Sequence, residues 1–311
     1  MFPAIGVLGC GYWGSNHIKT LSLLGNLYAV ADIDNEKATN KAKEYGVNAL
    51  SPEDMLKYAD IDAIVIALPP QFHAQYAEAA IINNKHVLVE KPISLDVDSA
   101  QKVVDIAAKH GKILAVGHIL RFHNVFQKIQ ELVNSGAIGE VKYISSTRLG
   151  FGKFHSKSDA MWDLAPHDLS LILAIAGRDF ISVNKDSSNI IDSKGIDFVN
   201  IGLDFRSIKA QLRVSRLSPY RERKFMVVGS KAIILWDDLK PVEEKLSIYK
   251  YDISKDELCW DGQIKDAEYI AIENNMPLTD ELINFISSIK NNVGPLTPGI
   301  DGVDVLKILT A

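Results

Sequence analysis

A buried strand that runs directly into a glycine-rich turn limits this chain to a narrow set of folds. The apolar run Ala4–Leu8 is followed at once by Gly9-Cys10-Gly11-Tyr12-Trp13-Gly14, and a helical pattern continues to Leu24. A strand, a G-x-G-x-x-G turn and a helix in that order predict a dinucleotide-binding unit. Gly9 permits the tight turn, Gly11 lets a pyrophosphate approach the backbone, and Gly14 lets the helix pack closely on the strand. The phosphate is expected at the helix N-terminus, where free amides favour an anion.

Apolar runs alternate with helical patterns over the first 120 residues. The runs are continuous, as in parallel strands that are covered on both faces. Strand–helix repeats at this spacing predict an α/β fold with a doubly wound parallel sheet, the Rossmann arrangement. The expected strands are Ala4–Leu8, Leu27–Ala31, Ala63–Leu68, His86–Val89 and Ile113–Val116, and the expected helices include Asn35–Tyr45, Phe72–Asn83 and Ser99–His110.

The pattern changes after Gly117. Apolar residues first recur at helical intervals from Phe122 to Val133, and the period then becomes two in Val199–Phe205 and Ile208–Val214. Alternation of this kind predicts a large, mostly antiparallel sheet with one buried face. We expect a Rossmann domain over residues 1–120 and an α+β domain over residues 121–311. A final helix is expected at Asp301–Ala311, and packing of this helix on the first domain is an alternative. Further strands are expected at Arg223–Val228, Lys231–Trp236 and Leu246–Tyr251, with polar surface connections at Asp237–Glu244 and Asp252–Asp266.

Charge and composition exclude several classes of protein. The 34 Lys and Arg against 39 Asp and Glu give a net charge of −5. No cationic run would neutralise phosphates along a duplex, so no nucleic-acid partner is expected. No apolar stretch approaches the ~18 residues that span a bilayer, which predicts no membrane partner. The two cysteines, Cys10 and Cys259, lack metal-ligand spacing and are too few for a disulfide framework. We expect a cytoplasmic protein without a metal site.

An acidic residue at the end of the second expected strand indicates which dinucleotide binds. Asp32 stands 18 residues after Gly14. A carboxylate there accepts hydrogen bonds from the ribose hydroxyls and repels a 2′-phosphate, so the expected cofactor is NAD. Asp34 is expected instead to cap the helix that begins at Asn35.

Glu90-Lys91-Pro92 follows the strand His86–Val89. Because ligands of open α/β sheets bind beyond the carboxyl ends of the strands, Lys91 is expected to face the cofactor. Beside an oxidised nicotinamide and shielded from water its pKa should fall, which suits a proton acceptor or a donor to a sugar oxygen. Pro92 restricts Lys91 to an extended conformation, and a cis bond here would fix where Lys91 points. A solvated Lys at a strand end is the simpler alternative.

Taken together, these motifs resemble the Gfo/Idh/MocA oxidoreductases over essentially the whole chain. The resemblance rests on the glycine turn, Asp32, Leu68-Pro69-Pro70 with His73, and Glu90-Lys91-Pro92. It implies that Lys91 is catalytic. It also implies that the cofactor site includes Gly9, Gly11, Tyr12, Trp13, Gly14, Asp32, Leu68, Pro69, His73, Glu90 and Lys91.

The family's second motif is an Asp followed four residues later by a His at the start of a helix, here Asp163 and His167. Residues four apart share one face of a helix. Pro166 predicts that this helix begins close by, because proline is tolerated in a first turn. Asp163 is expected to hold the imidazole or to take part in a proton relay, and His167 to reach a substrate hydroxyl. No third ligand indicates a metal. The remaining histidines, His17 among them, are expected to be structural or on the surface.

Within the family, Gly117–His123, Ser146–Lys153 and Trp162–Ser170 look most like nucleotide-sugar 3-dehydrogenases. This resemblance implies NAD-dependent oxidation of the C3 hydroxyl of a UDP-N-acetylhexosamine, or its uronic acid, by hydride transfer to nicotinamide. Lys91, Asp163 and His167 would contact the substrate. Arg121, Arg148 and Lys153 are cations that suit a diphosphate or uronate, with surface ion pairs as the alternative.

Two other functions stay open. One is a dehydrogenase of a free sugar or polyol such as inositol, because the same catalytic residues serve many substrates. The other is a catalytically silent NAD-binding regulatory protein, against which the intact Lys91, Asp163 and His167 argue. The residues do not decide whether Lys91 or His167 is the general base. A homodimer or homotetramer is expected to form through the sheet of the second domain, as is usual in the family.

Overall fold

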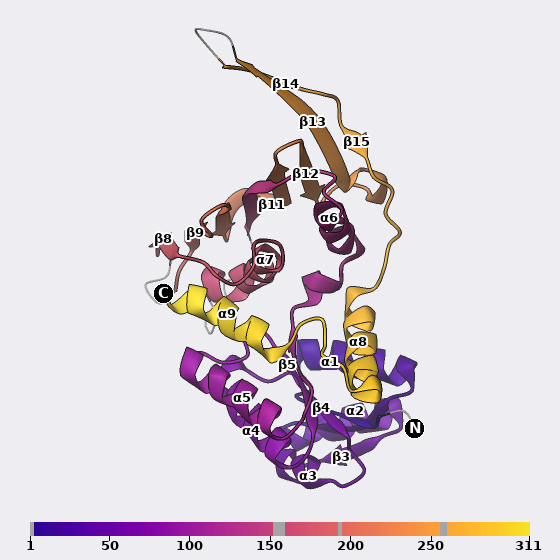
Figure 1. Cartoon of the computed structure of the whole chain (residues 1–311). Coiled ribbons are helices and arrows are strands. Elements are labelled where there is room, and N and C mark those ends of the chain that lie inside the picture. Colours follow the sequence, from indigo (N-terminus) through magenta and orange to yellow (C-terminus); the bar gives the residue numbers. More distant parts are fainter. Residues whose placement is uncertain (1–2, 152–158, 192–194, 256–259) are drawn as a thin grey trace. The chain divides into compact units, whose positions relative to one another are not determined.

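The structure, a computed structural model, describes residues 3–151, 159–191, 195–255 and 260–311. The chain divides into two compact units. One comprises the residues up to Phe122 together with Met276–Thr310, and the other comprises His123–Asn275 (Figure 1). The segment 276–310, which the sequence analysis placed in the second domain, therefore packs in the first unit. No described helix is long and apolar enough to cross a membrane.

The first unit is built around a six-stranded parallel sheet with the order β3-β2-β1-β4-β5-β6. The predicted doubly wound sheet is confirmed, and its strand order reverses between β1 and β4, the place where such sheets bind ligands. Each predicted apolar run is a strand, and β3 is an addition. The strands are β1 (Ile5–Leu8), β2 (Leu27–Ala31), β3 (Asn48–Leu50), β4 (Ala63–Ile66), β5 (His86–Glu90) and β6 (Leu114–Gly117).

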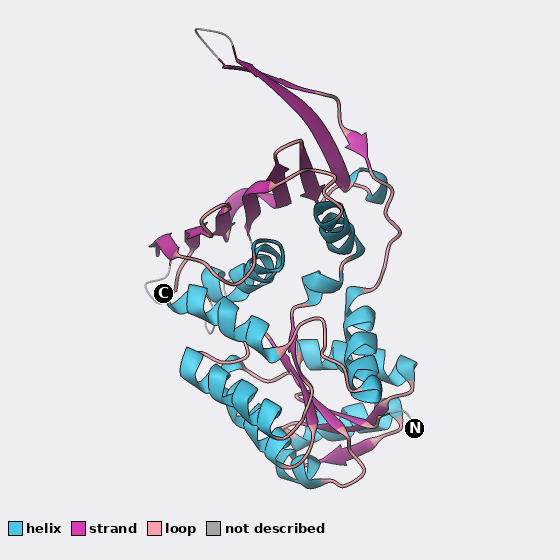
Figure 2. Cartoon of the chain, in the orientation of Figure 1, coloured by secondary structure: helices cyan, strands magenta, loops and turns pink. Residues whose placement is uncertain are grey.

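Helices cover both faces of this sheet (Figure 2). On one face, α1, α2 and α8 share an apolar core in which Ile18, Ala38 and Phe285 are fully buried. On the other face, α5 packs against α4 and α9. The helices are α1 (Tyr12–Leu24), α2 (Asn35–Tyr45), α3 (Pro52–Lys57), α4 (His73–Ile82), α5 (Val97–Lys109), α8 (Pro277–Asn291) and α9 (Gly299–Thr310), with 3-10 turns η1 (Pro70–Phe72) and η2 (Ile119–Phe122).

The second unit contains the predicted, mostly antiparallel sheet, in which the described residues form nine strands. Its order is β14-β13-β12-β11-β7-β10-β9-β8, with β15 also paired to β13, and the β7–β10 pair is parallel. The elements are α6 (Asn124–Asn134), β7 (Val141–Phe151), α7 (Ala160–Ala176), β8 (Ser182–Ser188), β9 (Phe198–Asp204), β10 (Lys209–Ser215), β11 (Leu217–Gly229), β12 (Ala232–Asp237), η3 (Val242–Glu244), β13 (Leu246–Lys255), β14 (Trp260–Ile264) and β15 (Glu268–Tyr269).

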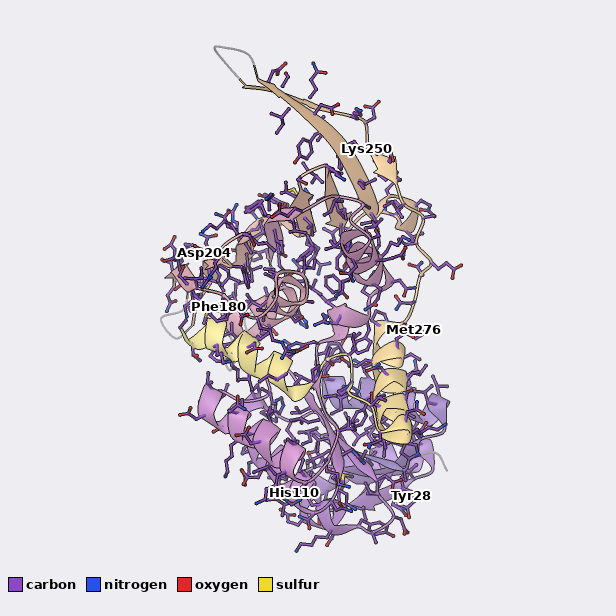
Figure 3. All side chains as sticks on the ribbon, in the orientation of Figure 1. Tyr28, His110, Phe180, Asp204, Lys250 and Met276 are labelled. Atoms are coloured by element: carbon purple, nitrogen blue, oxygen red, sulfur yellow. The ribbon has the colours of Figure 1, made fainter. Side chains whose placement is uncertain are left out.

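One segment that was predicted to be a polar connection is a strand pair. Much of Asp252–Asp266 belongs to the antiparallel pair of strands β13 and β14. Figure 3 labels Lys250 on β13, and its amine lies 2.8 Å from Oε1 of Glu268. Ile253 and Ile264 are exposed. Main-chain pairing rather than burial defines these strands, so the sequence does not show the alternation that marks a half-buried strand.

Candidate active site

The glycine turn after β1 is closed toward the sheet and open toward solvent. Gly9 has a φ of 105°, and a Cβ on it would lie 2.4 Å from the carbonyl oxygen of Ala67. A Cβ on Gly14 would lie 1.8 Å from the carbonyl oxygen of Gly9. A Cβ on Gly11 would meet no described atom within 4 Å. The turn therefore has the close packing and the open backbone that a bound pyrophosphate requires.

Helix α1 starts directly from this turn. Gly11 is its N-cap, no described side chain bonds to that cap, and the first turn carries no acidic residue. Its free N–H groups and helix dipole favour an anion. Tyr12 and Trp13 begin the helix and are 81% and 39% exposed. The beginning of α1 thus fits the phosphates of a dinucleotide.

Asp32 follows β2 and is held by two backbone amides. Its Oδ2 accepts from the Cys10 N–H at 2.7 Å, and its Oδ1 accepts from the Asp34 N–H at 2.9 Å. Each carboxylate oxygen has a second lone pair, so Asp32 retains the capacity to accept from ribose hydroxyls. Asp34 caps α2 by accepting from the Lys37 N–H, as predicted. Burial, with the charge of Asp32, raises the pKa of Cys10 to about 11, which keeps this thiol protonated near neutral pH.

Glu90 at the end of β5 is paired with His17 of α1. Nε2 of His17 lies 2.8 Å from Oε1 of Glu90, and the Lys91 N–H donates to Oε2 at 3.3 Å. Burial alone would raise the pKa of Glu90, but the hydrogen bond and charge of His17 and the charge of Lys91 hold it below the usual value. Glu90 is therefore a largely buried carboxylate that is hydrogen-bonded to the backbone of Lys91.

His73 ties together the loops that follow β4 and β5. Its Nδ1 lies 2.7 Å from the carbonyl oxygen of Pro92, and its Nε2 lies 2.6 Å from that of Leu68. Burial lowers the pKa of His73, whereas both carbonyls act in the opposite direction. The sequence analysis placed His73 in the cofactor site, but its ring nitrogens engage the backbone. The Lys91–Pro92 bond is cis, as the sequence analysis allowed.

Two further titratable side chains are buried in the first unit near Glu90. Within the described residues, neither oxygen of Glu281 on α8 and neither ring nitrogen of His118 has a hydrogen-bond partner. Burial and the charge of Glu90 raise the pKa of Glu281 well above its ordinary value. Burial and the charge of Arg121 lower the pKa of His118 to about 3. Burial therefore favours the neutral form of both side chains.

Arg121, predicted to bind substrate, lies in η2 of the first unit and is 8% exposed. Its Nη1 lies 3.3 Å from Oδ2 of Asp301 on α9. This ion pair connects two segments of the first unit that are 180 residues apart.

In the second unit, Asp163 and His167 lie on α7. Asp159 caps this helix by accepting from the Trp162 N–H at 2.9 Å, and the helix runs from Ala160 to Ala176. The prediction that Pro166 lies in its first turn is wrong, because Pro166 lies inside the helix. The tight N-cap at Asp159 starts the helix earlier, at the cost of one backbone hydrogen bond at Pro166. Asp163 and His167 are partly exposed and four residues apart, so they share one face.

Arg148 on β7 is engaged by α7. Its Nη2 donates to Oδ1 of Asp168 at 3.1 Å, and its Nε pairs with Oδ2 of the same carboxylate. Arg148, which was predicted to bind a substrate anion or to form an ion pair, is thus paired with a buried acid. Lys153, predicted to bind substrate, lies outside the described residues. No group of three or more His, Cys, Asp or Glu among the described residues could hold a metal ion.

Comparison with known proteins identifies the family. Residues 4–118 match the oxidoreductase family with an NAD-binding Rossmann fold that is named after GFO, IDH and MocA. Residues 126–235 match the GFO/IDH/MocA C-terminal domain. The chain belongs to the Gfo/Idh/MocA oxidoreductase family. It is an oxidoreductase with an NAD-binding Rossmann unit.

Several members of the family are similar to this chain. The UDP-N-acetylglucosamine 3-dehydrogenase of Acidithiobacillus ferrooxidans is 32% identical over 57% of this chain and 56% of that enzyme. Its solved structure aligns over 99% of this chain and 95% of its own, with 26% identity and a TM-score of 0.87. The myo-inositol 2-dehydrogenase of Thermotoga maritima is 24% identical over 96% of this chain and 91% of that enzyme. The inositol 2-dehydrogenase of Rhizobium meliloti is 26% identical over 100% of this chain and 96% of that enzyme.

Sequence reasoning missed three residues of these sites. His17 was predicted to be structural or on the surface, and the structure shows it buried on α1, but the sequence did not predict its pairing with Glu90. Glu281 gave a signal that was not used, since an acid interrupts the apolar helical pattern of Leu278, Leu282 and Phe285. Asp168 was noted in the His167 segment without a role, and only the structure pairs it with Arg148.

Proposed function

We propose that this oxidoreductase oxidises the C3 hydroxyl of a UDP-N-acetylhexosamine, or of its uronic acid, to a 3-keto nucleotide sugar. The observation that carries this proposal is the likeness to the UDP-N-acetylglucosamine 3-dehydrogenase of A. ferrooxidans, which extends over 99% of this chain. Proteins of the same fold act on many different substrates, so the identity of the substrate needs its own test.

Bound NAD supplies the hydride acceptor. Gly9, Gly11 and Gly14 shape the turn that would hold its pyrophosphate, and Tyr12 and Trp13 flank that turn. Asp32 would accept from the ribose hydroxyls and repel a 2′-phosphate. The proposed cofactor site is completed by Leu68, Pro69, Glu90 and Lys91. His73 connects the loop after β4 to the loop after β5.

The proton of the C3 hydroxyl needs an acceptor. Lys91 at the end of β5 and His167 on α7 are the candidates, and Asp163 would hold the imidazole or relay the proton. General bases of these types act when their protonation state changes near the working pH. Of the predicted substrate cations, Arg121 and Arg148 are engaged by Asp301 and Asp168. We retain Arg121 as a candidate for binding the diphosphate or uronate because an Arg presents five donors.

The test is absorbance at 340 nm with purified protein, NAD and one substrate at a time. UDP-N-acetylglucosamine, its uronic acid and myo-inositol are offered separately, at near-stoichiometric enzyme so that a single turnover is visible. A rise with a UDP-sugar alone supports the proposal and identifies the oxidation state at C6. A rise with myo-inositol alone rejects it.

A second candidate function is oxidation of a free polyol. Two inositol dehydrogenases align over 96% and 100% of this chain, which is more of its length than the sequence alignment with the UDP-sugar enzyme covers. This candidate predicts turnover of a substrate without a nucleotide. The same 340 nm assay separates the two candidates.

We also propose that two copies associate through the second sheet. Met226 pairs with Leu235, Val228 with Ile233, and Ile233 with Tyr249, so these side chains share one face. They are partly exposed, whereas Phe225, Val227 and Ile234 on the opposite face are buried. An apolar face of this kind suits a second copy. Ile233→Asp should shift the mass in light scattering toward the monomer, and an unchanged mass would reject this interface.

A further inference from the structure

Asp168 fastens helix α7 to strand β7. It is 3% exposed and follows His167 directly in the chain. Its Oδ1 accepts from the Ser146 hydroxyl at 2.8 Å and from Nη2 of Arg148 at 3.1 Å, while Oδ2 pairs with Nε of Arg148. Two residues on the same face of β7 therefore hold both oxygens of one carboxylate.

The contacts of Asp168 with Ser146 and Arg148 fix the rotation of α7 about its own axis. Successive residues of a helix are about 100° apart, so fixing Asp168 against the sheet also fixes the direction of its neighbour His167. Asp163, four residues before His167, lies on the same strip as the imidazole. A bidentate Arg–carboxylate pair is well suited to this task because its two parallel hydrogen bonds restrict angle as well as distance.

The charge of Arg148 reaches beyond its partner. Desolvation lowers the pKa of Arg148, but the charges of Asp168, Asp238 and Asp163 outweigh it and raise the pKa. The guanidinium thus interacts with the acid that anchors α7 and with the acid that shares a face with His167. Its neighbour Arg223 donates from Nη1 to the Leu149 carbonyl at 2.6 Å.

We infer that Arg148, through Asp168 and Ser146, is a positioning residue for the Asp163–His167 pair rather than a ligand for a substrate anion. The inference rests on the proposed role of His167 in proton transfer. It predicts that loss of the Arg148–Asp168 pair lowers kcat with little change in KM. Loss of a substrate anion ligand would instead raise KM.

The test compares Arg148→Met, Arg148→Lys and the double variant Arg148→Met/Asp168→Leu, each assayed well below its melting temperature. The double variant removes both buried charges, so it should recover much of the stability that Arg148→Met loses. We expect kcat to fall between about tenfold and about a hundredfold in all three, because small misplacements of a reacting group have effects of this size. Lys cannot form the bidentate pair and should not restore kcat.

A matched control is Ile234→Ala on β12, which removes buried packing from the same unit without touching the pair. It should lower the melting temperature and leave kcat and KM near their normal values. A double variant with recovered stability and normal kcat would show that the pair is only structural. A raised KM at normal kcat in Arg148→Met would make Arg148 a substrate ligand. Either result overturns the inference.

A second measurement separates this inference from the proposed function. His167→Asn should reduce turnover as strongly as Arg148→Met or more. Normal turnover in His167→Asn would reject the role of His167 itself. Lost turnover in His167→Asn with normal turnover in Arg148→Met would reject only the positioning role. The pH dependence of kcat should also move in Arg148→Met, since a charge near Asp163 is removed, whereas it should stay unchanged in Ile234→Ala.

Discussion

His17 and Glu90 join helix α1 to the end of strand β5 through a 2.8 Å contact across 73 residues of sequence. His17 is fully buried and Glu90 nearly so. Removing one member of a buried pair leaves the other polar group unpaired, which typically costs about 3–5 kcal/mol. We expect His17→Ala to lower the free energy of unfolding by an amount in this range, as measured by urea denaturation.

The double variant His17→Ala/Glu90→Gln provides the control for that prediction. It no longer buries a carboxylate, so its free energy of unfolding should exceed the value that simple addition of the two single effects gives. Strict additivity would mean that the two side chains do not interact in solution.

Gly14→Ala should abolish NAD binding, because its Cβ would lie 1.8 Å from the Gly9 carbonyl oxygen and the turn would have to open. Gly11→Ala is the matched comparison, since its Cβ would meet no described atom within 4 Å. Gly11→Ala should melt near the wild-type temperature. It should nevertheless bind NAD more weakly than wild type, because the added methyl group occupies the space through which the pyrophosphate approaches the backbone. Calorimetric titration with NAD and thermal melts measure both effects. Equal NAD affinity in wild type and Gly14→Ala would contradict the proposed phosphate site.

Lys91→Ala should nearly abolish turnover and leave NAD affinity largely intact, because the proposed role of Lys91 is proton transfer. Removal of a general acid or base typically lowers the rate by about 10²–10⁴-fold. Stopped-flow absorbance at 340 nm measures the hydride step, and titration calorimetry measures NAD affinity. Lys102→Ala, an exchange on α5 where Lys102 pairs with Glu78, controls for the loss of one positive charge. Near-normal turnover in Lys91→Ala would rule out this role.

Glu281→Gln should stabilise the protein increasingly as the pH rises. In the folded protein, burial and the charge of Glu90 raise the pKa of Glu281 well above 4.5, so the folded state keeps a proton that the unfolded chain releases. Stability therefore falls by about 1.4 kcal/mol per pH unit between the ordinary pKa and the folded-state pKa. Gln cannot ionise and lacks this loss. Urea denaturation at pH 4, 5.5, 7 and 8.5 measures the difference between variant and wild type.

Glu53→Gln, an exchange of an exposed acid in the same unit, controls for the change in net charge. Its difference from wild type should stay nearly constant with pH. If Glu281→Gln behaved in the same way, Glu281 would be ionised in the folded protein.

Five of the six strands of the first sheet were predictable because each contains a short apolar run, as burial on both faces demands, whereas β3 is short and mostly exposed and was not predicted. Helix α2 was predicted with the bounds Asn35–Tyr45 that the structure has, since Asp34 caps it and Gly46 ends it. Strand β8 was not predicted, because Ser182–Ser188 is mostly exposed and contains almost no apolar residues. Helix α8 was overlooked although Leu282, Phe285 and Ile286 follow a helical period.

The candidate site was predictable only where chemistry resides in short motifs. The glycine turn, Asp32 and Asp34 could be interpreted from the sequence, since each acts within a few residues of its own backbone. The pairing of Arg148 with Asp168, or of His73 with the carbonyls of Leu68 and Pro92, depends on how distant segments pack. Residue spacing along the chain contains no such information, so the sequence left ion pairs at Arg121 and Arg148 open as an alternative and did not identify their partners Asp301 and Asp168.

The return of residues 276–310 to the first unit has a consequence for biosynthesis. A nascent chain that has emerged only as far as Asn275 contains the whole parallel sheet, but not Leu282, Phe285 and Ile286 of its core. Domains generally fold as units as they leave the ribosome. Here the nucleotide-binding unit stays incomplete, with apolar surface uncovered, until α8 has been made. Its maturation is therefore delayed until after synthesis of the second unit, whose sequence is inserted within it.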